Sequence, residues 1–460
     1  MAKYKAYPEY KDSGVEWLGR IPEQWTVSKV KYLAPFQVSW TPPTKNDENF
    51  IGNNLWVTIS DLRDKFISAS AKFISNKAVK EASMNITPKG SLLYSFKLSV
   101  GAVSFAGCNL YTNEAIASFL ENAHLPLSYL YYSLPIFIIE NASTNIYGAK
   151  ILNQELIKNS FLLAAECGES EKISVFLDHE TAKIDNLLEK QQQLIELLKE
   201  KRQAVISHAV TKGLNPDVPM KDSGVEWLGQ IPTHWSISKV RYCFLFDKGL
   251  TITKENLQDE GIPCINYGEI HSRYGFEINP NIHKLKYVNN AHLKNDKNSL
   301  LIKGDIIFAD TSEDVEGAGN FSQLTTDSSI FAGYHTIIAR PKERQNYRFL
   351  AYLFDCQELR SQIKHAVKGV KVFSITQAIL RGLSIWLPPK NEQEYISKLL
   401  DNQTATIDTL IQKQLQQIEL LKERRTALIA AAVTGKIDLR DWTPPASSTE
   451  APLTAEEATA

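Results

Sequence analysis

The sequence predicts an α+β protein with two mixed α/β domains, separated by two long antiparallel coiled-coil helices and related by an internal pseudo-two-fold repeat. Three observations predict this fold class. A motif of 22 residues occurs twice, a helical segment of 35 residues occurs twice, and a divergent block lies between each motif and its helix. Each half of the 460 residues therefore contains a short motif, a variable block and a long helix.

The short motif, called the tryptophan motif below, reads KDSGVEWLGRIPEQWTVSKVKY in residues 11–32 and KDSGVEWLGQIPTHWSISKVRY in residues 221–242. Sixteen of these 22 positions are identical at an offset of 210, which indicates internal duplication. We expect the tryptophans of both copies to fill the core of each half. These are Trp17, Trp25, Trp227 and Trp235.

Between tryptophan motif and helix, blocks 33–165 and 243–390 share little more than short apolar runs that follow glycine turns. Examples are KGSLLYSF (Lys89–Phe96) and KGDIIFAD (Lys303–Asp310). Such runs are typical of strands in mixed α+β domains, although one sequence does not predict how the strands connect. Two different blocks in one repeated frame indicate two recognition modules of different specificity.

The long helices run from Leu177 to Thr211 and from Leu400 to Thr434, and they align without a gap at an offset of 223. Apolar residues at seven-residue spacing predict a coiled-coil seam on each helix. The predicted seam residues are Ile184, Leu187, Leu194, Leu198 and Val205 in the first helix, and Ile407, Leu410, Ile418, Leu421 and Leu428 in the second. Gln191 and Gln414 occupy equivalent seam positions, where a polar residue can fix register.

These features divide the chain into five segments. They are 1–168, the first domain with its tryptophan motif; 169–212, the first helix; 213–390, a linker and the second domain; 391–437, the second helix; and 438–460, a tail. The tail is predicted to be disordered, because its last 18 residues are rich in Pro, Thr, Ala and Glu. The exit of the second helix and the first tryptophan motif are two ends of one interrupted junction, so the chain termini should meet.

Composition excludes several classes of protein. The five cysteines form no C-x-x-C pair, which favours a reducing compartment, and no apolar run of about 18 residues could cross a membrane. We therefore expect a cytoplasmic protein. The chain has no Walker A motif, no Asn/Asp-Pro-Pro-Tyr/Phe methyltransferase motif and no metal-like spacing of histidines, which favours a protein without an active site or metal.

Both blocks are mildly basic. Residues 26–165 have 12 Lys/Arg against 9 Asp/Glu, and residues 236–390 have 20 against 16. This excess is compatible with nucleic acid, but taken alone it is better explained by an ordinary solvated surface. Candidate contacts follow predicted strands or lie in glycine loops: Arg63, Lys65, Ser95, Lys97 and Lys150 in the first block, and Tyr267, Arg273, Tyr274, Lys368 and Lys371 in the second.

The paired tryptophan motifs, the divergent blocks and the repeated I-E-L-L-K-E-[KR]-R helices together resemble the specificity subunit of Type I restriction-modification systems. The resemblance covers Tyr10 to about Trp442. It implies two target recognition domains, each reading one half of a split site in double-stranded DNA, and helices that dock two methyltransferase subunits. It implies no catalytic residue in this chain.

The resemblance also implies partners and cofactors outside the chain. The methyltransferase subunits would carry S-adenosylmethionine and methylate adenine, and two motor-nuclease subunits would use ATP and Mg to cleave unmodified DNA. A helix of about 35 residues spans roughly 50 Å, which exceeds one turn of DNA at about 34–36 Å. Such helices could separate two half-site readers. The alternative hypothesis is a coiled-coil scaffold whose domains bind proteins.

One segment departs from the family pattern. WLPPKNEQEYISKLLD (Trp386–Asp401) carries the family's Pro-Pro pair and its Glu392-Gln393 pair before the second helix. The corresponding stretch of the first half, LLAAECGESEKISVFLD (Leu162–Asp178), lacks both pairs. The start of the first helix is therefore expected to be held differently.

Overall fold

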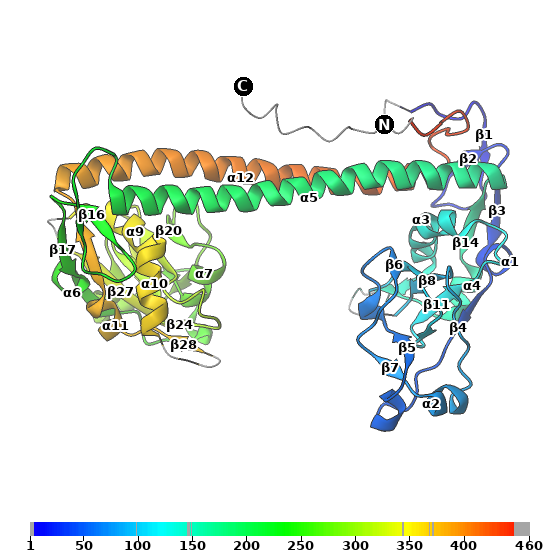
Figure 1. The fold of residues 1–460 in the computed structure, drawn as a ribbon, viewed down its shortest axis with the longest axis horizontal. Coiled ribbons are helices and arrows are strands. Elements are labelled where there is room, and N and C mark those ends of the chain that lie inside the picture. Colours follow the sequence, from blue (N-terminus) through cyan, green and yellow to red (C-terminus); the bar gives the residue numbers. More distant parts are fainter. Residues whose placement is uncertain are drawn as a thin grey trace. The chain divides into compact units, whose positions relative to one another are not determined.

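The computed structural model describes residues 4–97, 99–144, 148, 150–342, 345–367, 369 and 372–445. The chain divides into two compact units (Figure 1): residues 1–191 with 417–460, and residues 192–416. The division falls within the long helices α5 (Cys167–Lys212) and α12 (Lys390–Val433), so each unit contains part of both.

The first unit contains a five-stranded sheet in the order β4-β11-β8-β9-β6 and a three-stranded sheet in the order β10-β5-β7. The strands are β1 Tyr10–Asp12, β2 Arg20–Pro22, β3 Thr26–Lys29, β4 Phe36–Val38, β5 Asn54–Val57, β6 Phe66–Ile67, β7 Phe73–Ile74, β8 Leu92–Ser95, β9 Val103–Ala106, β10 Tyr111–Thr112, β11 Ile116–Phe119, β12 Ser143–Thr144, β13 Lys150–Ile151 and β14 Phe161–Ala164. The helices before α5 are α1 Val30–Leu33, α2 Asn76–Glu81, α3 Leu127–Phe137 and α4 Gln154–Asn159.

The second unit contains a five-stranded sheet in the order β18-β27-β23-β25-β20 and a four-stranded sheet in the order β21-β19-β26-β22. The strands are β15 Met220–Asp222, β16 Gln230–Pro232, β17 Ser236–Lys239, β18 Phe244–Lys248, β19 Ile262–Ile265, β20 Phe276–Ile278, β21 Lys286–Val288, β22 Leu300–Leu301, β23 Ile306–Ala309, β24 Thr311–Ser312, β25 Phe321–Leu324, β26 Ile330–Ala332, β27 Thr336–Pro341, β28 Phe373–Ser374 and β29 Ser384–Leu387. The helices before α12 are α6 Val240–Cys243, α7 Tyr267–Ser272, α8 His292–Asn295, α9 Tyr347–Asp355, α10 Gln357–Ala366 and α11 Gln377–Gly382.

The two divergent blocks form five-stranded sheets with the same strand order. In both five-stranded sheets the first four strands are antiparallel to their neighbours, and the last pair, β9–β6 or β25–β20, is parallel. The central strands β8 and β23 are buried at every residue, since each is covered on both faces. The α+β class and the internal repeat predicted from the sequence are confirmed, and the repeat includes the blocks whose sequences differ.

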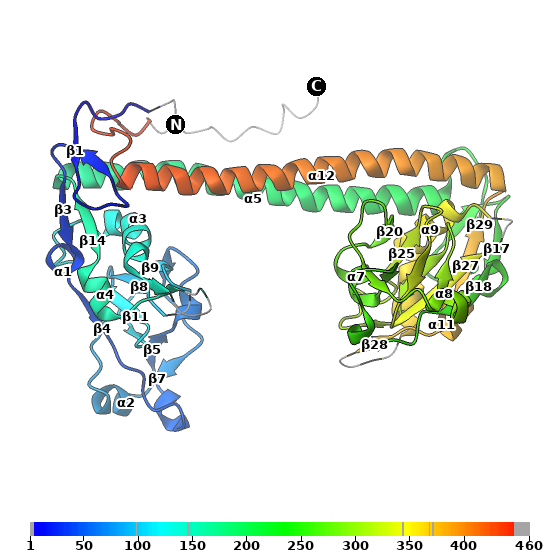
Figure 2. The same ribbon diagram turned by 180° about the vertical axis from the view of Figure 1, so that it is seen from behind.

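Each sheet is connected to the long helices through one intervening helix (Figure 2). In the first unit α3 packs between the sheet and α5, and the Tyr132 hydroxyl donates to Asp178 of α5 at 2.5 Å. In the second unit α9 takes this place, and Tyr352 donates to Asp401 of α12 at 2.7 Å. The same contact between a buried tyrosine and an aspartate thus anchors both domains.

The two long helices run antiparallel within each unit. In the first, Lys172 donates to the carbonyl of Arg440, while Asp185, further along α5, pairs with Arg425 at 2.9 Å. In the second, Arg202 pairs with Asp408 at 3.0 Å. The two aspartate–arginine pairs are equivalent at the offset of 223.

The seam follows an alternation of four and three residues along each helix. In α5 it passes through Ile184, Leu188, Gln191, Ile195, Leu198, Arg202 and Val205, which are buried or half-buried. In α12 it passes through Ile407, Ile411, Gln414, Ile418, Leu421, Arg425 and Leu428, also buried or half-buried. Steps of four and three average 3.5 residues, as a coiled-coil seam requires.

The predicted seam position is wrong for three residues. Leu187, Leu194 and Leu410 are 44%, 39% and 40% exposed, and in each case the seam passes instead through the residue that follows. Seven-residue spacing alone cannot separate two adjacent heptad rows, since both rows repeat every seven residues. The predicted seam positions of Ile184, Leu198, Val205, Ile407, Ile418, Leu421 and Leu428 agree with their burial.

Each tryptophan motif places one indole ring against the start of a long helix. Trp25 and Trp235 are buried, and their indole nitrogens donate to Glu169 at 3.1 Å and to Glu392 at 3.2 Å. These two glutamates are equivalent at the offset of 223, so the first half keeps the glutamate although it lacks the Glu-Gln pair. Only the glutamine of the pair is replaced, by Ser170.

The other tryptophan of each motif is not a core residue. Trp17 and Trp227 are 41% and 39% exposed. The ring of Trp17 lies 5.6 Å from that of Phe137, and Trp227 stacks on His365 at 4.8 Å. Each covers the edge of its domain instead of filling it.

Described residues near the two ends of the chain lie together, as the interrupted junction predicted. The backbone nitrogen of Asp438 donates to the carbonyl of Lys5 at 2.8 Å, and Trp442 packs edge-on against Phe176 at 5.3 Å. Leu439 is also buried. Residues 438–442 are therefore packed, unlike the disordered tail expected from 438 onward, while 446–460 lie outside the described residues.

Candidate nucleic-acid interface

Each domain has a pocket where the central strand of its five-stranded sheet ends. In the first domain a pocket of 580 Å³ includes Lys97, two residues after β8. In the second a pocket of 710 Å³ includes Thr311, two residues after β23. Loops that follow buried strands carry many binding sites, because the sheet holds them rigidly while their side chains stay exposed.

The pocket of the first domain combines an exposed aromatic ring with an ion pair. Trp40 is 66% exposed beside it, and the Lys97 ammonium lies 3.5 Å from the Glu114 carboxylate. Burial by itself would raise the pKa of Glu114, but hydrogen bonds from Thr41 and its own backbone, together with Lys97, hold that pKa below its ordinary value. Glu114 is therefore ionised and holds the predicted contact Lys97 at the rim.

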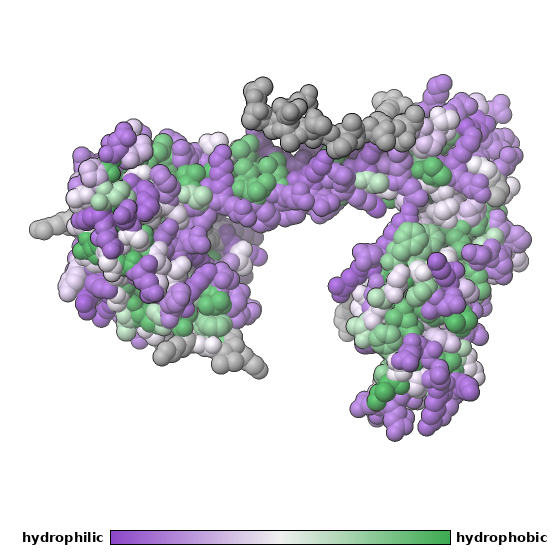
Figure 3. Space-filling model, viewed as in Figure 1, coloured by the Kyte–Doolittle hydropathy of each residue, from purple (hydrophilic) through white to green (hydrophobic). Residues whose placement is uncertain are grey.

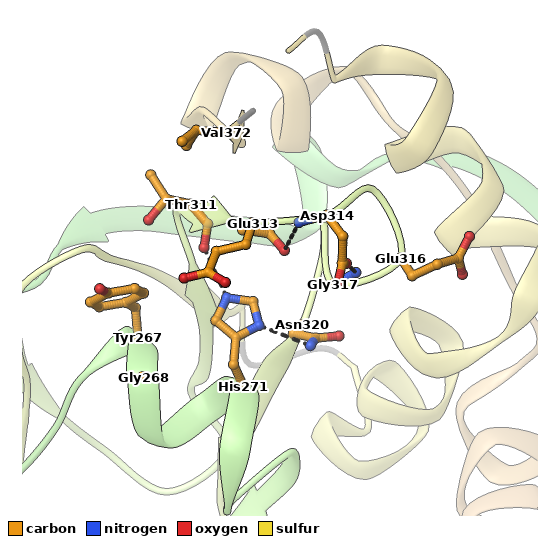
Figure 4. Close-up of a pocket in the computed structure, with 11 residues that line it drawn as sticks. Tyr267, Gly268, His271, Thr311, Glu313, Asp314, Glu316, Gly317, Asn320 and Val372 are labelled. Atoms are coloured by element: carbon orange, nitrogen blue, oxygen red, sulfur yellow. Dashed lines mark hydrogen bonds between the residues drawn. The ribbon is translucent and has the colours of Figure 1, made fainter. Parts of the chain in front are cut away.

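The pocket of the second domain lies between α7 and the loop after β23 (Figure 4). Helix α7 begins with a capping box, in which Asn266 accepts from the backbone of Glu269 while the Glu269 side chain accepts from the backbone of Asn266 at 2.9 Å. This cap fixes where the next residue, Tyr267, projects. The predicted contact Tyr267 thus lies on the pocket wall.

A second cavity in the first unit, of 330 Å³, brings together the predicted contacts Arg63 and Lys65. The Lys65 ammonium pairs with Asp178 of α5 at 2.6 Å and lies 5.4 Å above the Tyr131 ring. Lys65 therefore helps attach the domain to α5. Arg63 is exposed, and its Nε donates to the carbonyl of Ser60 at 2.9 Å.

The remaining predicted contacts fall in different places. Ser95 is fully buried and its hydroxyl donates to the carbonyl of Lys97, so it cannot reach DNA from the surface as expected, because β8 is covered on both faces. Lys150 and Arg273 are exposed. Tyr274 donates to the carbonyl of Lys284 at 2.7 Å. Lys368 and Lys371 lie outside the described residues.

Sequence reasoning missed other residues of the two pockets. These are Trp40, Glu114, His271, Glu313 and Asn320. Because candidates were chosen among basic and aromatic residues, the carboxylates and the histidine were passed over. Trp40 had a usable signal, because a tryptophan between Ser39 and Thr41-Pro42-Pro43 lies in a polar, turn-forming stretch.

The side chains that line the two pockets include aromatic rings, carboxylates and the amine of Lys97. Within the described ranges no group of three or more His, Cys, Asp or Glu side chains is placed to hold a metal ion. Among those same residues no helix is both long and apolar enough to cross a bilayer.

The model of the Type I restriction modification DNA specificity domain matches residues 22–197 and 232–420. Over 453 residues the chain is 24% identical to the MjaIX specificity subunit of a Type I restriction enzyme of Methanocaldococcus jannaschii, covering 96% of this chain and 99% of that protein. It is 26% identical over 215 residues to the EcoKI specificity subunit of Escherichia coli, covering 45% of this chain and 44% of that protein.

Solved structures share the fold. One, from a study of complex assembly and conformational transition of the type I R-M system, superposes with a TM-score of 0.69 at 14% identity and covers 91% of this chain and 99% of that one. The HsdS subunit from Thermoanaerobacter tengcongensis superposes with a TM-score of 0.51 at 13% identity, covering 93% and 100%.

Proposed function

The chain belongs to the family of Type I restriction-modification DNA specificity subunits, and we propose that its first domain reads one half of a split DNA site and its second domain reads the other half. The protein is the DNA-recognition subunit and is not itself a catalyst. Which residues contact bases, and which half each domain reads, are parts of the proposal.

One observation supports the proposal that each domain reads one half-site. Blocks 33–165 and 243–390 form five-stranded sheets of identical strand order and direction, yet the pockets at equivalent strand ends have different linings. The first has a tryptophan with a lysine–glutamate pair, and the second has a tyrosine, a histidine, two glutamates and an aspartate. A common scaffold with different side chains at one place supports two readers of different DNA sequence.

The repeat also supports docking of two methyltransferase subunits. Exposed leucines recur on both long helices at the offset of 223: Leu187 with Leu410, and Leu197 with Leu420, which are 62% and 58% exposed. Figure 3 shows apolar side chains on the otherwise hydrophilic surface of these helices. Two like surfaces favour two copies of one partner, and exposed apolar side chains favour protein contacts.

We expect the cofactors to be bound by the partner subunits and not by this chain. The methyltransferase subunits would supply S-adenosylmethionine, and motor-nuclease subunits, two in number, would supply the ATP and Mg chemistry of cleavage. This chain would contribute sequence selection and placement. The cytoplasmic location expected from the sequence stays a prediction.

The test is an exchange of one block. Residues 33–165 are replaced by the corresponding block of another specificity subunit, and methylated adenines are mapped in DNA treated with the reconstituted methyltransferase. We expect one half of the methylated site to change and the other to stay. The matched control, exchange of residues 243–390, should change the opposite half. An unchanged site after both exchanges would contradict the proposal and favour a protein-binding scaffold.

A further inference from the structure

The pocket of the second domain has a rigid wall on one side. The Nε2 atom of His271 lies 2.8 Å from the carbonyl oxygen of Thr311, an acceptor, so this nitrogen carries the proton and donates. The Nδ1 atom is then the acceptor, and the Asn320 amide donates to it at 3.0 Å. Arg360 donates in turn to the Asn320 oxygen, which fixes the orientation of that amide. Both imidazole nitrogens are occupied, so His271 shapes the pocket without reading a ligand.

The carboxylates of the pocket are not equivalent. Asp314 accepts from the backbone nitrogen of Gly317 at 2.6 Å, and Glu316 pairs with Lys364. In the part of the chain that the structure describes, Glu313 forms no hydrogen bond or ion pair. Figure 4 shows its carboxylate directed toward His271 and Tyr267, while Glu316 points away. Glu313 is thus an exposed acceptor at the pocket wall.

An aromatic ring flanks this acceptor. Tyr267 is half-buried, and its ring packs edge-on against Tyr334 at 5.7 Å and His335 at 5.3 Å. His335 has a φ of 55°, in the left-handed region that a non-glycine residue adopts at a cost in energy. Its carbonyl accepts from the backbone nitrogen of Asp310 at 3.0 Å, which ties this turn to the end of the central strand. The ring of Tyr267 is therefore held in place.

These features select the chemistry of a ligand. An ionised carboxylate only accepts hydrogen bonds, and it repels phosphate, so Glu313 would oppose nonspecific contact with the DNA backbone. It is favourable only against a donor. On the edges of bases in the major groove, the donors are the exocyclic amino groups of cytosine and adenine.

We propose that this pocket of the second domain reads an exocyclic amino group of a base, with Glu313 as the acceptor and Tyr267 packing beside the base edge. The inference rests on the proposed function, since it takes DNA as the ligand of this domain. In this proposal the Glu313 carboxylate recognises the base at one position of one half-site. Cytosine N4 and adenine N6 share the required chemistry, and the experiment distinguishes them.

The test uses the whole chain reconstituted with its methyltransferase subunits. Methyl transfer is measured on duplexes in which each position of the methylated site is varied in turn. Glu313→Gln keeps the size of the side chain and replaces one acceptor oxygen with a donor amide. We expect its preference to fall roughly tenfold at one position in the half read by the second domain, with the other half unchanged. Glu260→Gln makes the same change of charge on an exposed carboxylate of the second unit that is not part of the pocket lining, and it should keep the wild-type preference.

The amino group itself is then removed at the identified position. Purine replaces adenine, or a pyrimidinone lacking N4 replaces cytosine. The analogue that removes the recognised amino group should lower methyl transfer by the wild-type complex about tenfold and leave Glu313→Gln nearly unaffected. Equal losses for both proteins, or a Glu313→Gln preference identical to that of wild type, would overturn the assignment. A wild-type complex without any sequence preference would instead refute the proposed function, so the two failures are distinguishable.

Discussion

Arg202 of α5 and Arg425 of α12 occupy equivalent positions of the repeat, but they should contribute very different amounts to stability. Arg202 contacts Asp355 at 3.2 Å and Asp408 at 3.0 Å, and its side chain is 19% exposed. Arg425 contacts Asp185, and the two side chains are 35% and 50% exposed. Duplication thus provides a matched pair in a single chain.

The difference comes from the domain beside each arginine. Asp355 ends α9, and its side chain is 16% exposed, with Arg360 as a second, more distant partner at 3.7 Å. Matching Tyr132 with Tyr352 aligns Pro135 of α3 with Asp355, so the first domain has no carboxylate at this place.

Removing one partner of a buried pair costs about 3–5 kcal/mol, because the other charge is left without compensation. Since Asp355 retains Arg360, we expect Arg202→Ala to cost about 2–3 kcal/mol. An exposed pair contributes about 0.2–1 kcal/mol, so Arg425→Ala should cost less than about 1 kcal/mol.

Hydrogen exchange of backbone amides measures these local free energies. Arg202→Ala should speed exchange in α9 roughly 30- to 150-fold, and Arg425→Ala should speed exchange in α3 less than about fivefold. Equal effects of the two substitutions, or protection of α9 that does not change, would refute the reasoning.

A second substitution tests the mechanism. Burial raises the pKa of Asp355, although Arg202 and Arg360 act to lower it, so the charge is costly to hold in this place. Adding Asp355→Asn to Arg202→Ala removes the charge that is left with only its more distant partner Arg360, and it should recover most of the lost protection. A double variant that exchanges as fast as Arg202→Ala would show that the loss comes from the packing of the arginine stem.

Two further predictions concern the seam and the first pocket. Ile184 is 4% exposed and Leu187 is 44% exposed. In urea unfolding, Ile184→Ala should lower the free energy of unfolding by about 2–4 kcal/mol and Leu187→Ala by less than about 1 kcal/mol. A larger loss for Leu187→Ala than for Ile184→Ala would place the seam in the row through Leu187. The pKa of Glu114 is lowered, so its contribution to stability is complete above its pKa in the unfolded chain and is lost as pH falls through the lower folded value. Glu114→Gln should therefore flatten the decline of melting temperature below about pH 4.3, and a decline as steep as that of the wild type would contradict this.

The candidate interface was only partly accessible to sequence reasoning. Lys97 and Tyr267 were correctly placed just after strands, because local pattern is enough to place such residues at a strand end. Ser95 was misplaced because its burial depends on the cover over both faces of β8, which the local sequence does not show. Glu313 and His271 gave no local signal, since their roles depend on partners from other loops.

The sequence by itself determined the duplication, the two tryptophan motifs, the antiparallel helices and the meeting of the termini. These features depend on identities repeated at a constant offset and on a heptad pattern, which are properties of the chain read in one dimension. Glu169 and Glu392 illustrate the limit: their equivalence is visible at the offset of 223, yet their function as acceptors for Trp25 and Trp235 is not.

Only the tertiary structure decided which heptad row forms the seam, and that the divergent blocks share one strand order. Two adjacent rows have the same seven-residue period, and the choice between Leu187 and Leu188 depends on the surface that faces the other helix. Strand order depends on hydrogen bonds between backbones, which tolerate almost any side chains that keep the core apolar. Blocks of different sequence can therefore keep one scaffold while the side chains at its strand ends differ.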